Sequence, residues 1–245
     1  MSAFTSTSAS STSTLQRSAF SRLTLGSKLS WGLFGVAAFL VSIPVFVQAP
    51  LVRQWPWTSL FLTLGWVALG YALRRKATTA LYGDLILGFS LSWLAGSIYW
   101  GWFRWEPLVH LPIEAIAVPV AIWAIVRQRY WVGALFYLGS LWGTAVTDLY
   151  FYVVHLIPYW RQVMQIEPEG AFPILREALQ HMQTPWGILW VGLLVSVLCV
   201  SGLLPFTQLN VFKGDRTGLH WWVFSGAVMS TLLVDGLFWL AARLA

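Results

Sequence analysis

The sequence predicts an all-α, polytopic membrane protein with about seven transmembrane helices and a cytoplasmic N-terminus. Of its 245 residues, 58% are apolar and only 10% are charged, whereas a soluble domain averages about 25% charged residues. A span needs about 20 apolar residues, so the chain has room for seven spans with short loops and no second, soluble domain. Several of the 17 tryptophans stand at the ends of apolar segments, as is typical of membrane interfaces.

Residues 1–30 form a separate region ahead of the first span. Half of them are Ser or Thr, and no acidic residue precedes Asp84. Low apolar content with this bias predicts a disordered Ser/Thr-rich tail. The same composition also fits an organelle transit peptide, an alternative that the sequence leaves open.

The transmembrane bundle is expected to fill residues 31–245. Pro44 interrupts the first span, Arg74 ends the second, and two prolines together with His110 and Glu114 break up the fourth. The fifth span contains Asp148 and the seventh contains Asp235. The predicted spans cover residues 31–49, 58–73, 83–103, 108–126, 131–157, 186–206 and 220–243.

The one long loop, residues 158–184, lies between the fifth and sixth spans. From Ala171 onward, its apolar residues recur with a period nearer 3.6 than 2. This pattern predicts a short amphipathic helix lying on the membrane surface.

The distribution of basic residues predicts the orientation. Ten of the 15 Lys and Arg fall in the tail and in the loops after spans two, four and six, which places those segments in the cytoplasm. The basic residues are dispersed, without a run of five or more, so the net charge of +6 does not indicate nucleic-acid binding. The expected partners are membrane lipids and, as an alternative, other membrane proteins.

The fifth span is the helix around which the others are expected to be arranged. At helical spacing, one of its stripes is polar and the stripe beside it is small. A stripe of small residues lets another helix approach closely. The polar stripe consists of Ser140, Thr144, Asp148, Tyr152 and His155, and the small stripe consists of Gly139, Gly143 and Thr147.

Three acidic residues on three different spans are expected to lie at similar depth. With about 1.5 Å of rise per residue, they lie about 9 to 13 Å below the outer ends of their spans. Ionisable residues inside a membrane are costly and usually face protein or a cavity. The candidate intramembrane site consists of Glu114, Asp148, Asp235, His110, His155, Tyr152 and Thr144.

This set of residues permits several chemistries. Buried carboxylates and imidazoles can carry protons or bind cations, and they can also hold Mn, Fe or Zn. A haem held between His110 and His155 is a further alternative, as is a structural role in which each acid bonds to a neighbouring helix. Cys199 is the single cysteine, which excludes intrachain disulfides and Cys-based metal sites. The sequence therefore assigns neither a metal nor a cofactor.

The first hypothesis for function is transport or binding of a small solute or ion through the intramembrane carboxylates. The second is a membrane-embedded enzyme that acts on a lipid or isoprenoid with the same acids as general acid and base. The third is a structural or assembly factor that packs against other membrane complexes. The sequence contains no phosphate-binding loop, HExxH pair or nucleophile elbow. Enzyme activity is therefore undecided, with the balance against it.

Two segments carry a resemblance to a family. IPVFVQAPLVRQWPW (43–57) and GTAVTDLYFY (143–152) resemble an uncharacterised family of multi-span membrane proteins of unknown function from cyanobacteria. The resemblance covers roughly residues 30–243. It implies a plasma or thylakoid membrane and, for the third hypothesis, a photosynthetic membrane. It supplies no catalytic residues.

Overall fold

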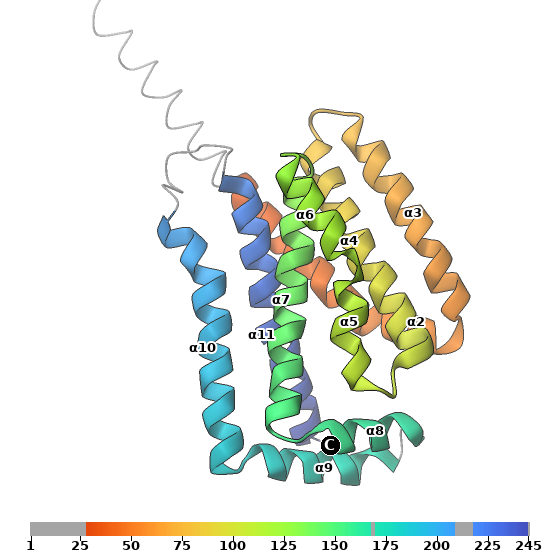
Figure 1. The fold of residues 1–245 in the computed structure, drawn as a ribbon, viewed down its shortest axis with the longest axis vertical. Helices are drawn as coiled ribbons and strands as arrows, with labels where there is room; N and C mark the ends of the chain where they lie inside the picture. The colour runs from red at the N-terminus through yellow and green to blue at the C-terminus, as the bar shows by residue number, and fades with distance from the viewer. Residues whose placement is uncertain (1–27, 168–169, 209–217, 245) are drawn as a thin grey trace, which may run out of the picture.

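The computed structural model describes residues 28–167, 170–208 and 218–244, and all regular structure in these ranges is helical (Figure 1). Most of the predicted tail, residues 1–27, lies outside the described residues. Six described segments have the length and hydropathy of membrane spans. These are Lys28–Gln54, Pro56–Arg74, Ala80–Phe103, Pro107–Val126, Pro185–Phe206 and Leu219–Leu240. The chain is therefore a multi-pass membrane protein.

Several spans change helical type along their length. The first ends in the π-helix η1 (Pro44–Gln48) and in α2 (Ala49–Gln54), and the second is α3 (Pro56–Arg74). The third joins α4 (Ala80–Ile98) to a π-helix, η2 (Tyr99–Phe103). The fourth is the most broken and consists of η3 (Pro107–Val109), α5 (His110–Glu114), η4 (Ala115–Ala117) and α6 (Val118–Val126).

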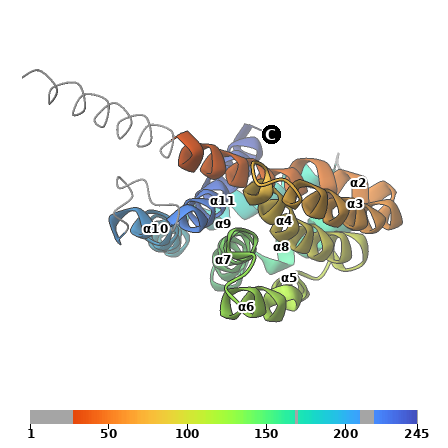
Figure 2. The same ribbon diagram turned by 90° about the horizontal axis from the view of Figure 1, so that it is seen from above.

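The last two spans are regular helices, α10 (Pro185–Gln208) and α11 (Leu219–Leu244). The fifth predicted span is α7 (Trp131–Val153), whose 23 residues are long enough to cross a membrane. It is not among the six segments above. Seen from above, α7 lies between α4, α6 and α11 (Figure 2), so we retain it as a span in addition to those six.

The predicted end of the fifth span at residue 157 is wrong. Helix α7 ends at Val153, and His155 follows in an exposed turn with a φ of 59°. Pro158 has no backbone N–H to donate to the carbonyl of Val154, so the helix cannot continue through it. His155 therefore lies off the helix, and the polar stripe ends at Tyr152.

Two short helices, α8 (Ile157–Gln165) and α9 (Ala171–Met182), lie across one end of the bundle (Figure 1). The predicted helix after Ala171 is confirmed in α9, which buries Leu179 and exposes Phe172 and Arg176. The sequence analysis missed α8. Its position on the membrane surface remains a prediction.

Helix α7 has a close contact on each of two faces. On one face, Gly88 of α4 and Gly133 of α7 bring their backbones together so closely that neither position has room for a Cβ. On the other face, a Cβ at Gly139 would lie 2.9 Å from the Phe224 carbonyl oxygen of α11, and one at Gly143 would lie 3.0 Å from the Thr231 Cβ. The prediction that another helix sits on the small stripe is confirmed, and that helix is α11.

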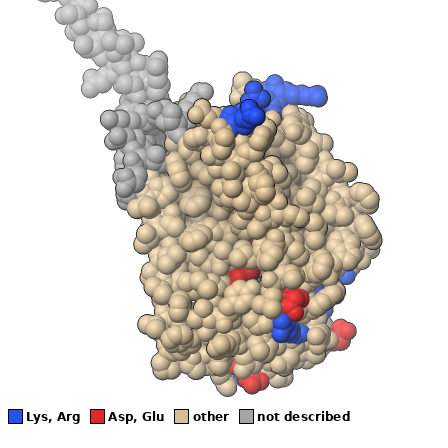
Figure 3. Space-filling view, in the orientation of Figure 1, with Lys and Arg blue, Asp and Glu red and all other residues tan. Residues whose placement is uncertain are grey.

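The charges differ between the two ends of the molecule. Basic side chains gather at the end that carries the α3–α4 and α6–α7 turns, whereas acidic ones lie toward the other end (Figure 3). The turns contribute Arg74, Arg75, Lys76, Arg127 and Arg129. The loops after the second and fourth spans were predicted to lie on the same side of the membrane, and the structure places them at the same end of the bundle (Figure 1).

We expect the basic end to face the cytoplasm, because Lys and Arg concentrate on that side of membrane proteins. In a Cys199→Ser background, cysteines placed at Lys76 and Gln128 should react with a membrane-impermeant maleimide only from the cytoplasmic side. A cysteine at Gln183, in the α9–α10 turn, should react only from the opposite side. The reverse pattern would overturn the orientation.

Candidate functional site

His110 links two carboxylates within the bundle. Its Nδ1 lies 3.1 Å from Asp148 Oδ1, and its Nε2 lies 3.3 Å from Glu114 Oε1. Glu114 is one turn further along the same span, whereas Asp148 projects from α7. All three side chains are less than one-fifth exposed. The sequence predicted a shared depth for these groups, and the structure joins them in a chain, which we call the His110 triad.

The broken fourth span places His110 and Glu114 in the triad. Pro112 lies between them, and the helix tightens to 3-10 geometry directly after Glu114. The Tyr137 hydroxyl of α7 donates a hydrogen bond to the backbone carbonyl of Glu114, which links the broken fourth span to α7. Tyr99 of η2 stacks on the imidazole with ring centroids 4.1 Å apart. The helix breaks and the aromatic ring together fix the orientation of His110.

The triad is linear. Each imidazole nitrogen contacts one carboxylate, so the three groups do not converge on a common point. Within the described ranges, no three His, Cys, Asp or Glu side chains are placed to hold a metal. Asp148 Oδ2 is buried and has no hydrogen-bond partner among the residues that the structure describes. Its lone pairs are therefore free to take a proton or another donor.

Asp235 lies on another face of α7. Its Oδ2 accepts a hydrogen bond of 2.8 Å from the Thr147 hydroxyl, next to Asp148 in the sequence. Consecutive residues of a helix point about 100° apart, so Asp148 faces α5 while Thr147 faces α11. Asp235 is near enough to interact electrostatically with Asp148, but it is not bonded to the triad.

The remaining predicted site residues do not join the triad. The Tyr152 hydroxyl donates to the Pro107 carbonyl at 3.5 Å, near the outer end of the site. Among the described residues, Thr144 and His155 make no side-chain hydrogen bond, and His155 is exposed. A haem clamp between His110 and His155 does not fit this arrangement, because both nitrogens of His110 already contact carboxylates.

The comparisons with known proteins identify the family. Residues 37–243 match the family described as protein of unknown function (DUF3120). The chain belongs to the DUF3120 family. The match includes every member of the His110 triad and Asp235. No curated protein and no solved structure matches the chain.

The predicted resemblance to an uncharacterised multi-span family is thus confirmed over most of the chain. The cyanobacterial origin and the plasma or thylakoid setting stay predictions. The family description assigns no activity, so a function for this DUF3120 protein can be proposed only from its geometry.

Helix α8 is held beside the triad by contacts that the sequence did not predict. Arg161 of α8 makes two bonds to Glu106, of 2.8 and 2.9 Å. The Trp160 indole donates to the Arg104 carbonyl at 2.8 Å and packs against Trp100, with ring centroids 5.8 Å apart. Because Trp100 and its neighbour Tyr99 both contact His110, these contacts fasten α8 over the outer side of the triad.

The Glu106–Arg161 pair makes the attachment of α8 to the bundle dependent on pH. The hydrogen bond from Arg161 lowers the pKa of the Glu106 carboxyl below its ordinary 4.5. A carboxyl whose pKa is lowered in the folded state stabilises that state above its ordinary pKa. The contribution is lost as the pH falls through the lowered pKa.

We expect Arg161→Gln to increase amide hydrogen exchange in α8 about two- to fivefold at pH 7, the range for a half-exposed ion pair. The difference from the parent should shrink as the pH falls through the lowered pKa of Glu106, since protonation breaks the pair in the parent too. Arg176→Gln on α9 is the matched control, because Arg176 makes no ion pair among the described residues. Equal rates of amide hydrogen exchange in α8 for Arg161→Gln and the parent at pH 7 would show that the ion pair does not hold α8 in place.

Two further buried polar groups had only weak signals in the sequence. Asp84 lies 3.4 Å from Arg74, and its other oxygen accepts a 3.1 Å bond from the Val132 N–H at the start of α7. Gln48 is fully buried and donates to the Trp93 carbonyl at 2.6 Å and to Ser97 at 2.9 Å. Gln48 bonds with residues far away in the sequence, so no local pattern could have revealed it.

Proposed function

We propose that this multi-pass membrane protein carries protons through the His110 triad and uses them to bind or move a small solute or ion. The observation that supports the proposal is the pair of contacts made by His110, one through each ring nitrogen to a different carboxylate. An imidazole can receive a proton at one nitrogen and release one at the other. The triad therefore has the connectivity of a proton relay.

The charge balance of the triad favours proton exchange. With both carboxylates ionised and His110 protonated, the three groups carry a net charge of −1. One additional proton makes the triad neutral, and burial in a medium of low dielectric constant favours the neutral state. Loss of that proton leaves a negative site, which is stabilised by an arriving cation. Asp148 Oδ2, which has no partner in the described part of the chain, is the atom best placed to hold the additional proton.

The helix geometry around the triad also supports transport. Transporters commonly build their sites from interrupted spans, where non-helical backbone is tolerated because it lines the site. Here the interrupted fourth span supplies two triad members. The π-helix η2 supplies Tyr99, which stacks on the imidazole, and π-helical turns are frequent at functional sites.

The test is proton uptake into liposomes that contain the purified protein and an internal pH-sensitive dye, driven by a potassium diffusion potential. We expect His110→Gln to slow uptake about tenfold or more, because glutamine forms hydrogen bonds but does not titrate. His181→Gln on the surface helix α9 is the matched control and should retain the parent rate. Parent liposomes that take up protons no faster than protein-free ones would refute the proposal. Unchanged uptake in a folded His110→Gln variant would also refute it.

A further inference from the structure

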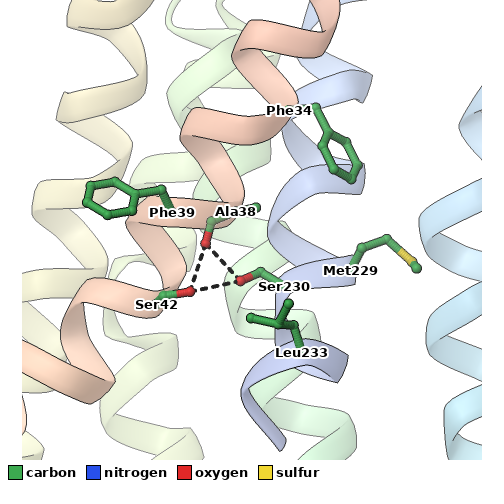
Figure 4. Close-up of a pocket in the computed structure, with 7 residues that line it drawn as sticks. All are labelled: Phe34, Ala38, Phe39, Ser42, Met229, Ser230 and Leu233. Atoms are coloured by element: carbon green, nitrogen blue, oxygen red, sulfur yellow. Dashed lines mark hydrogen bonds between the residues drawn. The ribbon is translucent and has the colours of Figure 1, made fainter. Parts of the chain in front are cut away.

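A groove on the surface of the bundle is independent of the triad. It lies between the first span and α11 and has a volume of about 290 Å³ (Figure 4). None of the described residues that line it is charged. Its walls are Phe34, Ala38, Phe39 and Ser42 from the first span and Met229, Ser230 and Leu233 from α11.

Close contacts at its two ends define the groove. At one end the two helices cross with their backbones in contact, since a Cβ at Gly226 would lie 3.1 Å from the carbonyl carbon of Phe34. Toward the other end the rings of Phe46 and Phe238 stack, with centroids 6.4 Å apart. The groove therefore has limited length and cannot extend along the whole span.

Two serine hydroxyls, of the half-buried Ser42 and the buried Ser230, meet at the wall of this otherwise apolar groove. Ser230 Oγ donates to the Ala38 carbonyl at 2.8 Å, and Ser42 Oγ donates to the same carbonyl at 3.1 Å. The two hydroxyl oxygens lie 3.3 Å apart. Each serine has one hydrogen and two lone pairs, so both hydrogens are used within the cluster while lone pairs remain. The centre thus offers hydrogen-bond acceptors to a ligand that brings a donor.

The polar centre lies near the middle of both helices. Ser42 is about 21 Å along the helix from Lys28 and about 18 Å from Gln54, at 1.5 Å per residue. Ser230 is about equally far from the two ends of the span Leu219–Leu240. The oxygens of a phospholipid lie in the headgroup region, outside a hydrocarbon core of about 30 Å. A phospholipid therefore reaches this depth only with its acyl chains, which have no donor.

We propose that the groove binds one molecule of a neutral lipid whose hydroxyl group donates a hydrogen bond to Ser42 and Ser230. A lipid without a charged headgroup can bring a hydroxyl to the middle of the membrane. Its apolar part then lies against Phe34, Phe39 and Met229. The volume is at the lower limit of ligand pockets, roughly 300 to 1,000 Å³, which fits a single chain or ring.

The experiment compares two probes on the whole protein in lipid nanodiscs. One is a long-chain primary alcohol with a photoreactive diazirine in its chain, and the other is the methyl ether of the same alcohol, which cannot donate. After illumination, labelled peptides are quantified by mass spectrometry. We expect the alcohol to label the peptides of the groove about fivefold more than the ether, as one hydrogen bond predicts.

Serine-to-alanine variants test whether Ser42 and Ser230 cause the stronger labelling by the alcohol. Ser42→Ala should lower the alcohol-to-ether ratio, and Ser42→Ala with Ser230→Ala should bring it to one. Ser196→Ala is the matched control because Ser196, exposed on α10, makes the same kind of backbone bond, to the Gly192 carbonyl at 2.7 Å. It should leave the ratio unchanged.

Several outcomes would overturn the proposal. Equal labelling by alcohol and ether on the parent protein would show that the hydroxyl is not recognised, and this comparison needs no variant. Cross-links between the grooves of two copies of the chain would show that a second copy occupies the site. Displacement of the alcohol by phospholipid acyl chains at equal concentration would show that the groove is ordinary lipid contact. None of these outcomes affects the His110 triad, so the two proposals stand or fall separately.

Discussion

Replacing Gly88 with alanine is expected to push α4 away from α7 and to destabilise the bundle by about 3 kcal/mol or more, the upper range for overpacking. The added Cβ would overlap the Gly133 carbonyl and come within 2.5 Å of the Gly133 Cα. These are backbone atoms of α7, so no side-chain rotation relieves the overlap. The measurement is thermal unfolding of the purified protein in detergent, followed by circular dichroism.

Gly192→Ala is the matched control for this substitution. Gly192 is also helical, on α10, and a Cβ there meets no atom within 4 Å. Because alanine has a higher helix propensity, this variant should be unchanged or more stable by up to about 1 kcal/mol. A Gly88→Ala variant that melts at the parent temperature would show that α4 and α7 do not pack as described.

The contact of α4 with α7 also fixes the depth of Asp148. Asp84, one turn from Gly88, accepts a hydrogen bond from Val132 at the first turn of α7. The two contacts set the position of α7 along its own axis. A shift of α7 by one residue would move Asp148 by about 1.5 Å, enough to lengthen its 3.1 Å contact with His110 beyond hydrogen-bonding range.

Features that depend on local spacing were predictable from the sequence. The apolar segments gave the spans, and the i,i+4 spacing of His110 and Glu114 is the spacing at which two helical side chains can meet. The glycine stripe on α7 predicted a close helix, though not which one. Each of these predictions needs only the period of a helix and the thickness of a membrane.

Features that depend on the rotation of helices about their axes were not predictable. Asp148 and Asp235 were expected in one site because they share a depth. The structure places Asp148 toward His110 and Asp235 toward Thr147, on different faces of α7. The end of α7 at Val153 was also missed, although Pro158 gave a local signal for it. Glu106 and Arg161 meet only because α8 folds back over the end of the bundle.

We expect Asp148→Asn to fold normally and to lose proton uptake. Asparagine has the shape of aspartate and keeps a hydrogen bond to His110, but it neither titrates nor carries charge. The melting temperature should therefore stay close to the parent value while uptake in the liposome assay falls to that of His110→Gln. Asp235→Asn is the comparison, because Asp235 bonds to Thr147 and not to the triad. It should retain most of the uptake.

Asp148→Leu separates the energetic role of this residue from its proton chemistry. Leucine leaves the His110 Nδ1 without its partner inside the bundle, and an unsatisfied buried polar group costs about 1 to 3 kcal/mol. We therefore expect a lower melting temperature than for Asp148→Asn, together with loss of uptake. An Asn variant that transports normally would restrict Asp148 to a structural role. A Leu variant as stable and as active as the parent would refute both roles, because the contact with His110 would then contribute neither to folding nor to proton transfer.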